Sequence, residues 1–158
     1  MKKREDLISI LRAEAVDLED ILGLQRRAFF EEAELYGDQN IPPLTQTLGD
    51  LKAEFQEKVF LKAVDEGRLV GSVRVGLRDG TALIGRLMVE KAWRRRGVGT
   101  RLLAAAETVF REASACELFT GERSVANLRL YRNCGYTVLR RENRSCRLVM
   151  VYLRKPIG

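Results

Sequence analysis

The sequence predicts a single α/β (α+β) domain over residues 1–158, in which a mixed, mostly antiparallel sheet is covered by helices. The spacing of apolar residues alternates between the period of a strand and that of a helix, in the order β-α-α-β-β-β-α-β-α-β-β. No linker, repeat or low-complexity segment interrupts this order. A chain of 158 residues is also the size of one domain with its own hydrophobic core.

The N-terminal third of the chain is expected to form one strand and two helices. Alternating apolar residues predict a strand over residues 7–12. Asp17 is expected to cap a helix that continues to about Ala33, because its apolar residues share one helical face. A glycine and two prolines in residues 37–43 end this pattern, and Thr47 is expected to cap a second, shorter helix.

Three strands separated by tight turns are expected next. They cover residues 59–65, 69–77 and 81–90, with turns at Glu66-Gly67 and Asp79-Gly80. Because turns of this length reverse the chain, the three strands are predicted to form an antiparallel meander.

The C-terminal part is expected to contain two helices and three strands. It continues with a helix over 100–113, a strand over 116–120, a helix between Ser124 and Gly135, and strands over 136–141 and 147–155. Ser124 is expected as the N-cap of its helix and Gly135 as a left-handed C-cap. The last strand is apolar on both faces, which predicts an internal position in the sheet.

Composition limits the class of protein. With 46% hydrophobic and 32% charged residues, the chain is typical of a soluble globular domain. The longest apolar run, residues 148–153, is far too short to span a bilayer, so no membrane contact is expected. The basic N-terminus is followed by acidic residues and by no apolar signal core, so a cytoplasmic location is expected.

The chemistry available to the chain is restricted by its histidine and cysteine content. There is no histidine, which excludes a histidine base or nucleophile partner and the common histidine metal sites. Cys116, Cys134 and Cys146 are widely spaced without any CxxC pair, so neither a disulfide framework nor a zinc site is expected. Catalysis must therefore rely on carboxylates, tyrosine, cysteine, backbone donors or water.

The stretch between the third strand of the meander and the next helix predicts an anion site. Its sequence is Arg94-Arg95-Arg96-Gly97-Val98-Gly99-Thr100. Two glycines allow close approach of the backbone, the first helical turn offers unpaired N–H groups, and three arginines add charge. The P-loop pattern is absent, and the third small residue of a dinucleotide fingerprint is replaced by Leu102.

This stretch fits Arg/Gln-x-x-Gly-x-Gly/Ala and resembles the acyl-CoA signature of the GNAT acetyltransferase superfamily. About thirty residues later, the run from Asn127 to Tyr136 resembles the second motif of that family, Asn-x-x-x-Tyr-x-x-x-Gly-Phe/Tyr. The two motifs occur in the expected order, and the predicted element order matches over nearly the whole chain. The resemblance implies the GNAT acyl-CoA N-acyltransferase fold, with a splayed sheet and helices on both faces.

The resemblance also implies acetyl-CoA as cosubstrate, no metal, and a set of site residues. The arginine and glycine stretch would bind the pyrophosphate of the cosubstrate. A splay or bulge at Leu87-Met88-Val89 would leave backbone groups free for the pantetheine arm, to which Asn127 would offer its amide. Tyr131 is the candidate general acid, because a phenol with a pKa of about 10 keeps its proton at neutral pH and can donate it to the departing thiolate.

The acceptor side is less defined by the sequence. In the resembled family the segment before the sheet covers the acceptor, so the candidates there are Phe30, Glu31, Glu34, Tyr36 and Ile41. The position at which some relatives hold a glutamate base is near Leu83, which cannot accept a proton. Glu34 is the preferred base, and Glu90 and Glu122 acting through water stay open.

The predicted function is transfer of an acetyl group from acetyl-CoA to a primary amine by direct attack in a ternary complex. The acceptor, the oligomeric state and a homodimer are left open. A non-catalytic acyl-CoA-binding regulatory module is the main alternative. A basic nucleic-acid-binding domain is a third, which the net charge of +6 allows but which no recognition motif supports, so no nucleic acid is expected.

Overall fold

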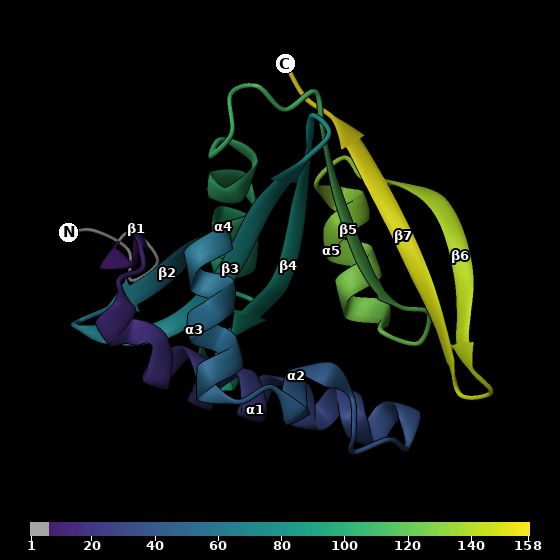
Figure 1. The fold of residues 1–158 in the computed structure, drawn as a ribbon, viewed down its shortest axis with the longest axis horizontal. Helices are drawn as coiled ribbons and strands as arrows, with labels where there is room; N and C mark the ends of the chain where they lie inside the picture. Colours follow the sequence, from purple (N-terminus) through teal and green to yellow (C-terminus); the bar gives the residue numbers. More distant parts are fainter. Residues whose placement is uncertain (1–6) are drawn as a thin grey trace.

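The computed structural model describes residues 7–158, and within this range seven strands form one open sheet in the order β1-β2-β3-β4-β5-β7-β6. Neighbouring strands are antiparallel except β4 and β5, which run parallel. This confirms the predicted mixed, mostly antiparallel sheet and the internal position of the last strand (Figure 1). The strands are β1 (Ser9–Arg12), β2 (Val59–Asp65), β3 (Arg68–Arg78), β4 (Thr81–Val89), β5 (Ala115–Gly121), β6 (Thr137–Ser145) and β7 (Leu148–Pro156).

Helices cover both faces of this sheet. They are α1 (Leu18–Tyr36), α2 (Pro42–Thr45), α3 (Leu48–Glu57), α4 (Val98–Glu107) and α5 (Val125–Asn133), with short 3-10 turns η2 (Ala15–Asp17) and η3 (Lys91–Trp93). The turn of helix α2 was not expected from the sequence. Residues of α4 and α5 pack in one hydrophobic cluster, and residues of α1 and α3 pack in a second one.

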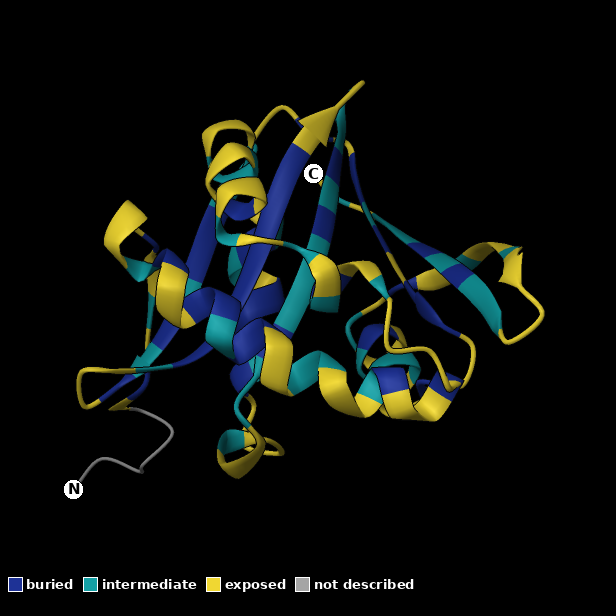
Figure 2. Ribbon diagram, turned by 60° about the horizontal axis from the view of Figure 1, so that its bottom comes forward, coloured by how far each residue is buried: buried dark blue, intermediate teal, exposed yellow. Residues whose placement is uncertain are grey.

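The alternation of side chains along β3 explains the two clusters. Val73 and Val75 belong to the cluster on the α4 face, whereas Arg74 between them points to α3. In β2, Leu61 and Phe60 divide in the same way. Figure 2 shows buried residues along the strands and exposed residues on the outer turns of the helices.

The beginning of α1 differs from the prediction. Asp17 has helical dihedral angles and makes no side-chain capping bond, because the 3-10 turn already starts the helical path at Ala15. Its carboxylate instead accepts hydrogen bonds from the Glu14 N–H (2.7 Å) and from Lys62 Nζ (2.9 Å). The prediction of Asp17 as a capping side chain was therefore wrong. At the other end, α1 continues past Ala33 until Gly37, whose φ of 64° ends it.

The ends of the later helices agree with the prediction at Thr47 and Gly135 and differ from it in α4. Thr47 caps α3 as expected, with its Oγ1 accepting from the Asp50 N–H at 3.1 Å. Helix α4 is shorter than predicted, because the N–H and the hydroxyl of Thr108 both turn back to the Ala105 carbonyl and end it. Gly135 follows α5 with a φ of 97°, which confirms the left-handed position expected there.

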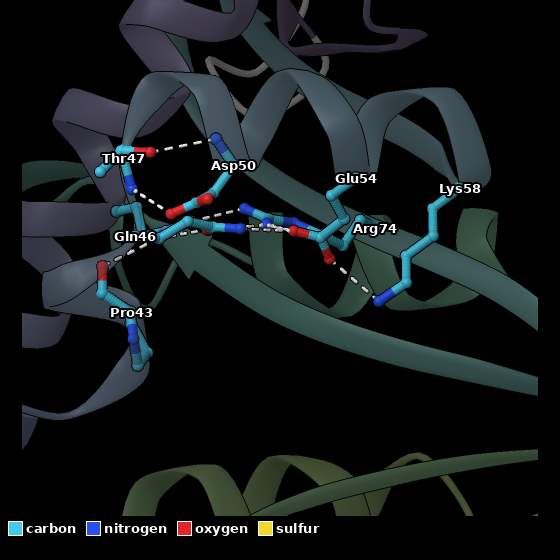
Figure 3. Close-up of polar contacts among 8 residues, drawn as sticks. Pro43, Gln46, Thr47, Asp50, Glu54, Lys58 and Arg74 are labelled. Atoms are coloured by element: carbon cyan, nitrogen blue, oxygen red, sulfur yellow. Dashed lines mark hydrogen bonds and ion pairs between the residues drawn. The ribbon is translucent and has the colours of Figure 1, made fainter.

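A buried arginine connects the helices of one face to the sheet. Arg74 of β3 is 1% exposed; its Nη1 lies 2.6 Å from Glu54 Oε1 of α3, and its Nη2 lies 2.5 Å from Gln25 Oε1 of α1. Gln25 in turn donates to the Pro43 carbonyl of α2 at 2.9 Å. Figure 3 shows Arg74 beneath α3, with Lys58 on the far side of the same carboxylate. One guanidinium thus positions three helices.

The charge state of Glu54 follows from this contact. Burial by itself raises the pKa of Glu54, but the Arg74 guanidinium, with hydrogen bonds from Gln46 and Lys58, outweighs it and lowers the pKa to about 2. Burial lowers the pKa of Arg74 to about 10, which still leaves it cationic at neutral pH. The pair is therefore ionised over the whole neutral range.

We expect Glu54→Gln to lower the free energy of unfolding by about 3 kcal/mol at pH 7, because it leaves the Arg74 charge buried without a counter-charge. The pKa of Glu54 is 4.5 in the unfolded state and about 2 in the folded state, so the ionised carboxylate stabilises the fold at pH values above 4.5. This contribution is lost as the pH falls towards about 2. The loss from Glu54→Gln should therefore shrink between pH 4.5 and 2. Urea unfolding of the wild type and of Glu54→Gln at pH 4.5 and at pH 2 measures this difference.

Lys58→Met is the matched control, since Lys58 contacts the same carboxylate but is 39% exposed. It should cost less than about 1 kcal/mol. Equal destabilisation by the two variants would contradict the role assigned to the buried pair.

Candidate functional site

The two central strands separate along most of their length. β4 and β5 pair only where Thr81–Leu83 meets Ala115–Glu117. Beyond this point they diverge, as Figure 1 shows. A cavity of about 620 Å³ lies where they separate, lined by residues of α1, β4, α4 and α5. Its walls therefore come from segments far apart in the sequence.

A bulge in β4 turns its backbone at this cavity. Ser72 pairs with Met88 and Arg74 with Gly85, so that one residue of β3 opposes two residues of β4, one of them Arg86. Arg86 has a φ of 51°, which is uncommon for a residue with a side chain. The bulge expected in this strand is thus confirmed, one residue earlier than predicted. The three predicted cosubstrate contacts of the strand, Leu87, Met88 and Val89, all line the cavity.

The arginine and glycine stretch also lies at the cavity. Gly97, with a φ of 78°, is the N-cap residue of α4. The Arg101 N–H bonds to the Gly97 carbonyl at 3.0 Å, so the preceding N–H groups of the helix have no partner within it. Of the predicted stretch, the residues that line the cavity are Arg94, Arg95, Gly97, Val98, Gly99 and Thr100. The side chain of Arg96 is exposed and does not line it.

Arg94 is held in place by two contacts. Its Nε donates to the Val89 carbonyl at 3.1 Å, and its Nη1 donates to Glu31 Oε2 at 2.9 Å. The exposed Arg95, with a φ of 63°, is not held by such contacts. The loop therefore offers helix N–H groups, glycine backbone and guanidinium groups at one end of the cavity, which is the chemistry that binds phosphate.

Helix α5 forms another wall. Asn127 lines the cavity, and its Nδ2 donates to Thr120 Oγ1 of β5 at 3.3 Å. Tyr131, one turn later, is 5% exposed, packs its ring at 6.2 Å from that of Tyr136 in the hydrophobic core, and does not line the cavity. Burial raises the pKa of Tyr131, and the nearby Glu32 carboxylate and Cys134 add to this. Tyr131 therefore stays protonated at neutral pH.

Ser124 makes a tertiary contact instead of the predicted cap. It occupies the N-cap position of α5 without a capping hydrogen bond. Its Oγ lies 2.7 Å from Glu32 Oε2 and 3.0 Å from the Tyr36 hydroxyl, both on α1. The prediction that its side chain caps the helix was wrong, because α1 brings stronger partners to it.

The predicted acceptor residues are divided among several places. Glu31 lines the main cavity, whereas Phe30 is 50% exposed and Glu34 is exposed, and neither lines it. Tyr36 and Ile41 line a second, smaller cavity of about 220 Å³ against the β6–β7 hairpin.

The other carboxylates considered as bases do not line the main cavity. Glu90 forms two hydrogen bonds with Arg27, of 3.1 and 2.8 Å. Glu122 is exposed at the end of β5, where its N–H bonds to the Val149 carbonyl. Neither carboxylate is brought to the place where β4 and β5 separate.

Sequence reasoning missed several residues of the cavity wall, above all Phe29 and Glu32. The α1 residues that face the cavity include Ala28, Phe29, Glu32 and Leu35. This is the i, i+1, i+4, i+7 spacing of one helical face, so counting the helical period from Phe29 would have selected Glu32 instead of Glu34. Arg123 also lines the cavity and carried no comparable signal.

Within residues 7–158, no three Cys, Asp or Glu side chains are arranged to hold a metal ion. In the same part of the chain, no helix combines the length and apolar character needed to cross a bilayer.

Several solved structures share this fold. The PaiA N-acetyltransferase of Thermoplasma acidophilum, solved with coenzyme A, superposes with a TM-score of 0.77 at 18% identity, covering 95% of this chain and 99% of that one. The ribosomal-protein-S18-alanine N-acetyltransferase of Escherichia coli gives 0.76 at 16% identity, covering 96% and 94%. YncA of Salmonella typhimurium, a putative acetyltransferase with acetyl-CoA, gives 0.72 at 18%, covering 96% and 95%.

Sequence comparison gives one curated relative and one family. The UPF0157 protein YqkA of Bacillus subtilis strain 168 is 28% identical over 123 residues, which are 78% of this chain and 35% of that protein. The chain thus spans about a third of the length of that relative. The model of the acetyltransferase (GNAT) family matches residues 18–136, from the start of α1 to the end of the second motif. The chain therefore belongs to the acetyltransferase (GNAT) family.

Proposed function

We propose that this protein transfers an acetyl group from acetyl-CoA to a primary amine, with both substrates in the cavity between β4 and β5. The observation that carries this proposal is that three features lie around one cavity of about 620 Å³. They are the arginine and glycine stretch of residues 94–100, called the anion loop below, the bulged strand β4, and Asn127. Family membership and the coenzyme A complexes of the PaiA and YncA structures support it. All three features are needed for a long ligand with phosphates at one end and amides along its arm.

The cosubstrate would lie along the cavity with its pyrophosphate at the start of α4. There the N–H groups of Val98, Gly99 and Thr100 and the guanidinium of Arg95 supply positive charge. The pantetheine arm would follow β4, whose backbone beyond Leu83 is not paired with β5. The Asn127 amide would reach the arm from α5, and a backbone N–H near Met88 would polarise the thioester carbonyl.

Tyr131 would act as the general acid. The amine attacks the thioester carbonyl carbon, the C–S bond breaks, and the departing thiolate needs a proton. Burial keeps the Tyr131 phenol protonated, and its place on α5 one turn after Asn127, which lines the cavity, supports this role. The phenolate then takes the proton that the new amide nitrogen releases, which restores Tyr131.

Two measurements test the function as a whole. Isothermal titration calorimetry with acetyl-CoA should show binding, and a panel of primary amines should release thiol from acetyl-CoA. Binding without turnover on any amine would instead indicate an acyl-CoA-binding module. Absence of binding would overturn the proposal.

Gly99→Val should reduce acetyl-CoA affinity at least about tenfold, because a branched side chain would occupy the space that the phosphate approaches. The fold should tolerate it, since a Cβ at Gly99 would meet Leu130 and Val89 at ordinary contact distances of 3.5 and 3.8 Å. Calorimetry measures the affinity, and circular dichroism with thermal unfolding checks the fold. Unchanged affinity would exclude this loop as the phosphate site.

Tyr131→Phe should lower kcat by about 10²–10⁴-fold and leave acetyl-CoA affinity close to that of the wild type, since only the transferable proton is lost. Tyr136→Phe is the matched control: this tyrosine is equally buried, but its hydroxyl donates to Glu107 at 2.8 Å, away from the cavity. Steady-state kinetics of the two variants show whether the loss of kcat is specific to Tyr131. A loss of less than threefold for Tyr131→Phe would assign the proton to water or to another group.

A further inference from the structure

We infer that Glu32 is the general base that deprotonates the acceptor amine, and that Ser124 and Tyr36 position it. This inference rests on the proposed function. It replaces the expectation for Glu34, because Glu32 lines the cavity and makes contacts with the start of α5, whereas Glu34 does neither.

Glu32 is distinguished from the other carboxylate of the cavity by its freedom from ion pairs. Among the described residues that line the main cavity, Glu31 and Glu32 are the two with carboxylates. Glu31 lies 2.9 Å from Arg94 and 3.6 Å from Lys91, which keep it ionised and hold it in place. No Lys or Arg of the described chain forms an ion pair with Glu32. Its carboxylate can therefore accept a proton from an ammonium group without first breaking a salt bridge.

The hydrogen bonds around Glu32 have a fixed direction. The Arg123 N–H donates to the Tyr36 hydroxyl oxygen at 2.9 Å. The Tyr36 proton is then available for Ser124 Oγ at 3.0 Å, and the Ser124 proton for Glu32 Oε2 at 2.7 Å. Burial raises the pKa of Tyr36, so it remains a donor at neutral pH. This series of hydrogen bonds ends on Glu32 Oε2 and leaves Oε1 to accept a proton from the amine.

A glycine permits this arrangement. Gly121, at the end of β5, lies directly against the Tyr36 ring, and a Cβ at this position would overlap the Tyr36 hydroxyl and the ring carbon that bears it. Tyr36 can reach both Arg123 and Ser124 because Gly121 has no side chain. The same close approach places the end of α1 against the end of β5.

The proposed base and the proposed acid lie on two different helices. Glu32 belongs to α1 and Tyr131 to α5, and the Glu32 charge is close enough to help raise the pKa of Tyr131. Among the described residues, the other charged groups that line the cavity with Glu32 are Glu31, Arg94, Arg95 and Arg123, and its charge also acts on the Tyr36 and Tyr131 hydroxyls.

The proton balance of the reaction is closed by these groups. The acceptor ammonium loses one proton to Glu32, and its nitrogen forms a bond to the acetyl carbon. The C–S bond breaks, and the thiolate takes the Tyr131 proton. The new amide nitrogen returns a proton to Tyr131, and Glu32 releases its proton to solvent. The net products are the amide, free coenzyme A thiol and one proton.

The pH dependence of kcat/KM tests the role of Glu32. Glu32→Gln should lower kcat/KM by about 10²-fold or more near pH 7, and the loss should shrink as the pH approaches the pKa of the amine, where free amine is present. Acetyl-CoA affinity should stay unchanged by calorimetry. Glu19→Gln, an exposed carboxylate near the start of the same helix, is the matched control and should behave as wild type.

Ser124→Ala tests the positioning role separately. A hydrogen bond to a carboxylate favours the ionised form, so its loss should move the acidic limb of the kcat/KM profile to higher pH. Gly121→Ala should have a similar effect, because it displaces Tyr36 from Ser124.

Two results overturn the assignment of Glu32: kinetics of Glu32→Gln within threefold of wild type across the pH range, or a larger loss for Glu34→Gln than for Glu32→Gln. Both leave the proposed function intact, since the wild type still turns over. A wild-type protein that neither binds acetyl-CoA nor releases thiol with any amine overturns the proposed function itself, and this inference with it.

Discussion

The separation of β4 from β5 is the constraint on which the rest of this structure depends. Parallel pairing stops after Leu83 and Glu117, and the backbone beyond that point is free of its neighbour. Unpaired peptide groups inside a protein are costly unless another partner satisfies them. In this chain the bulge at Arg86, the start of α4 and the start of α5 all meet at the gap. A ligand rich in amides and phosphates would supply the missing partners.

An opened sheet needs another source of rigidity, and the buried polar network supplies it. Arg74 lies in β3, next to the bulged strand, and connects the sheet to α1 and α3 through Gln25 and Glu54. A buried charge with defined hydrogen-bond partners adds a directional constraint to the hydrophobic packing of these helices on the sheet. The network thus fixes α1, and with it the side chains of Glu31 and Glu32 at the cavity.

The cavity wall shows how distance in the sequence differs from distance in space. Tyr36 and Ser124 are separated by 88 residues and lie in hydrogen-bonding contact. Gly121 allows this contact by lacking a side chain. None of these three residues shows its role in a local pattern: a tyrosine at a helix end, a serine before a helix and a glycine after a strand each have an ordinary structural interpretation. The role proposed for them follows only from their meeting in the fold.

The sequence by itself determined the order of strands and helices, the tight turns, the anion loop and the family, because these depend on periodicity and on short motifs that act locally. It also determined that Leu87, Met88, Val89 and Asn127 would share one site, through the resemblance of their motifs. Only the tertiary structure decided where β4 and β5 separate, which face of α1 meets the cavity and which carboxylate is free of ion pairs. Those features depend on the angle at which α1 crosses the sheet, and that angle is set by long-range contacts of Arg74 and Tyr36.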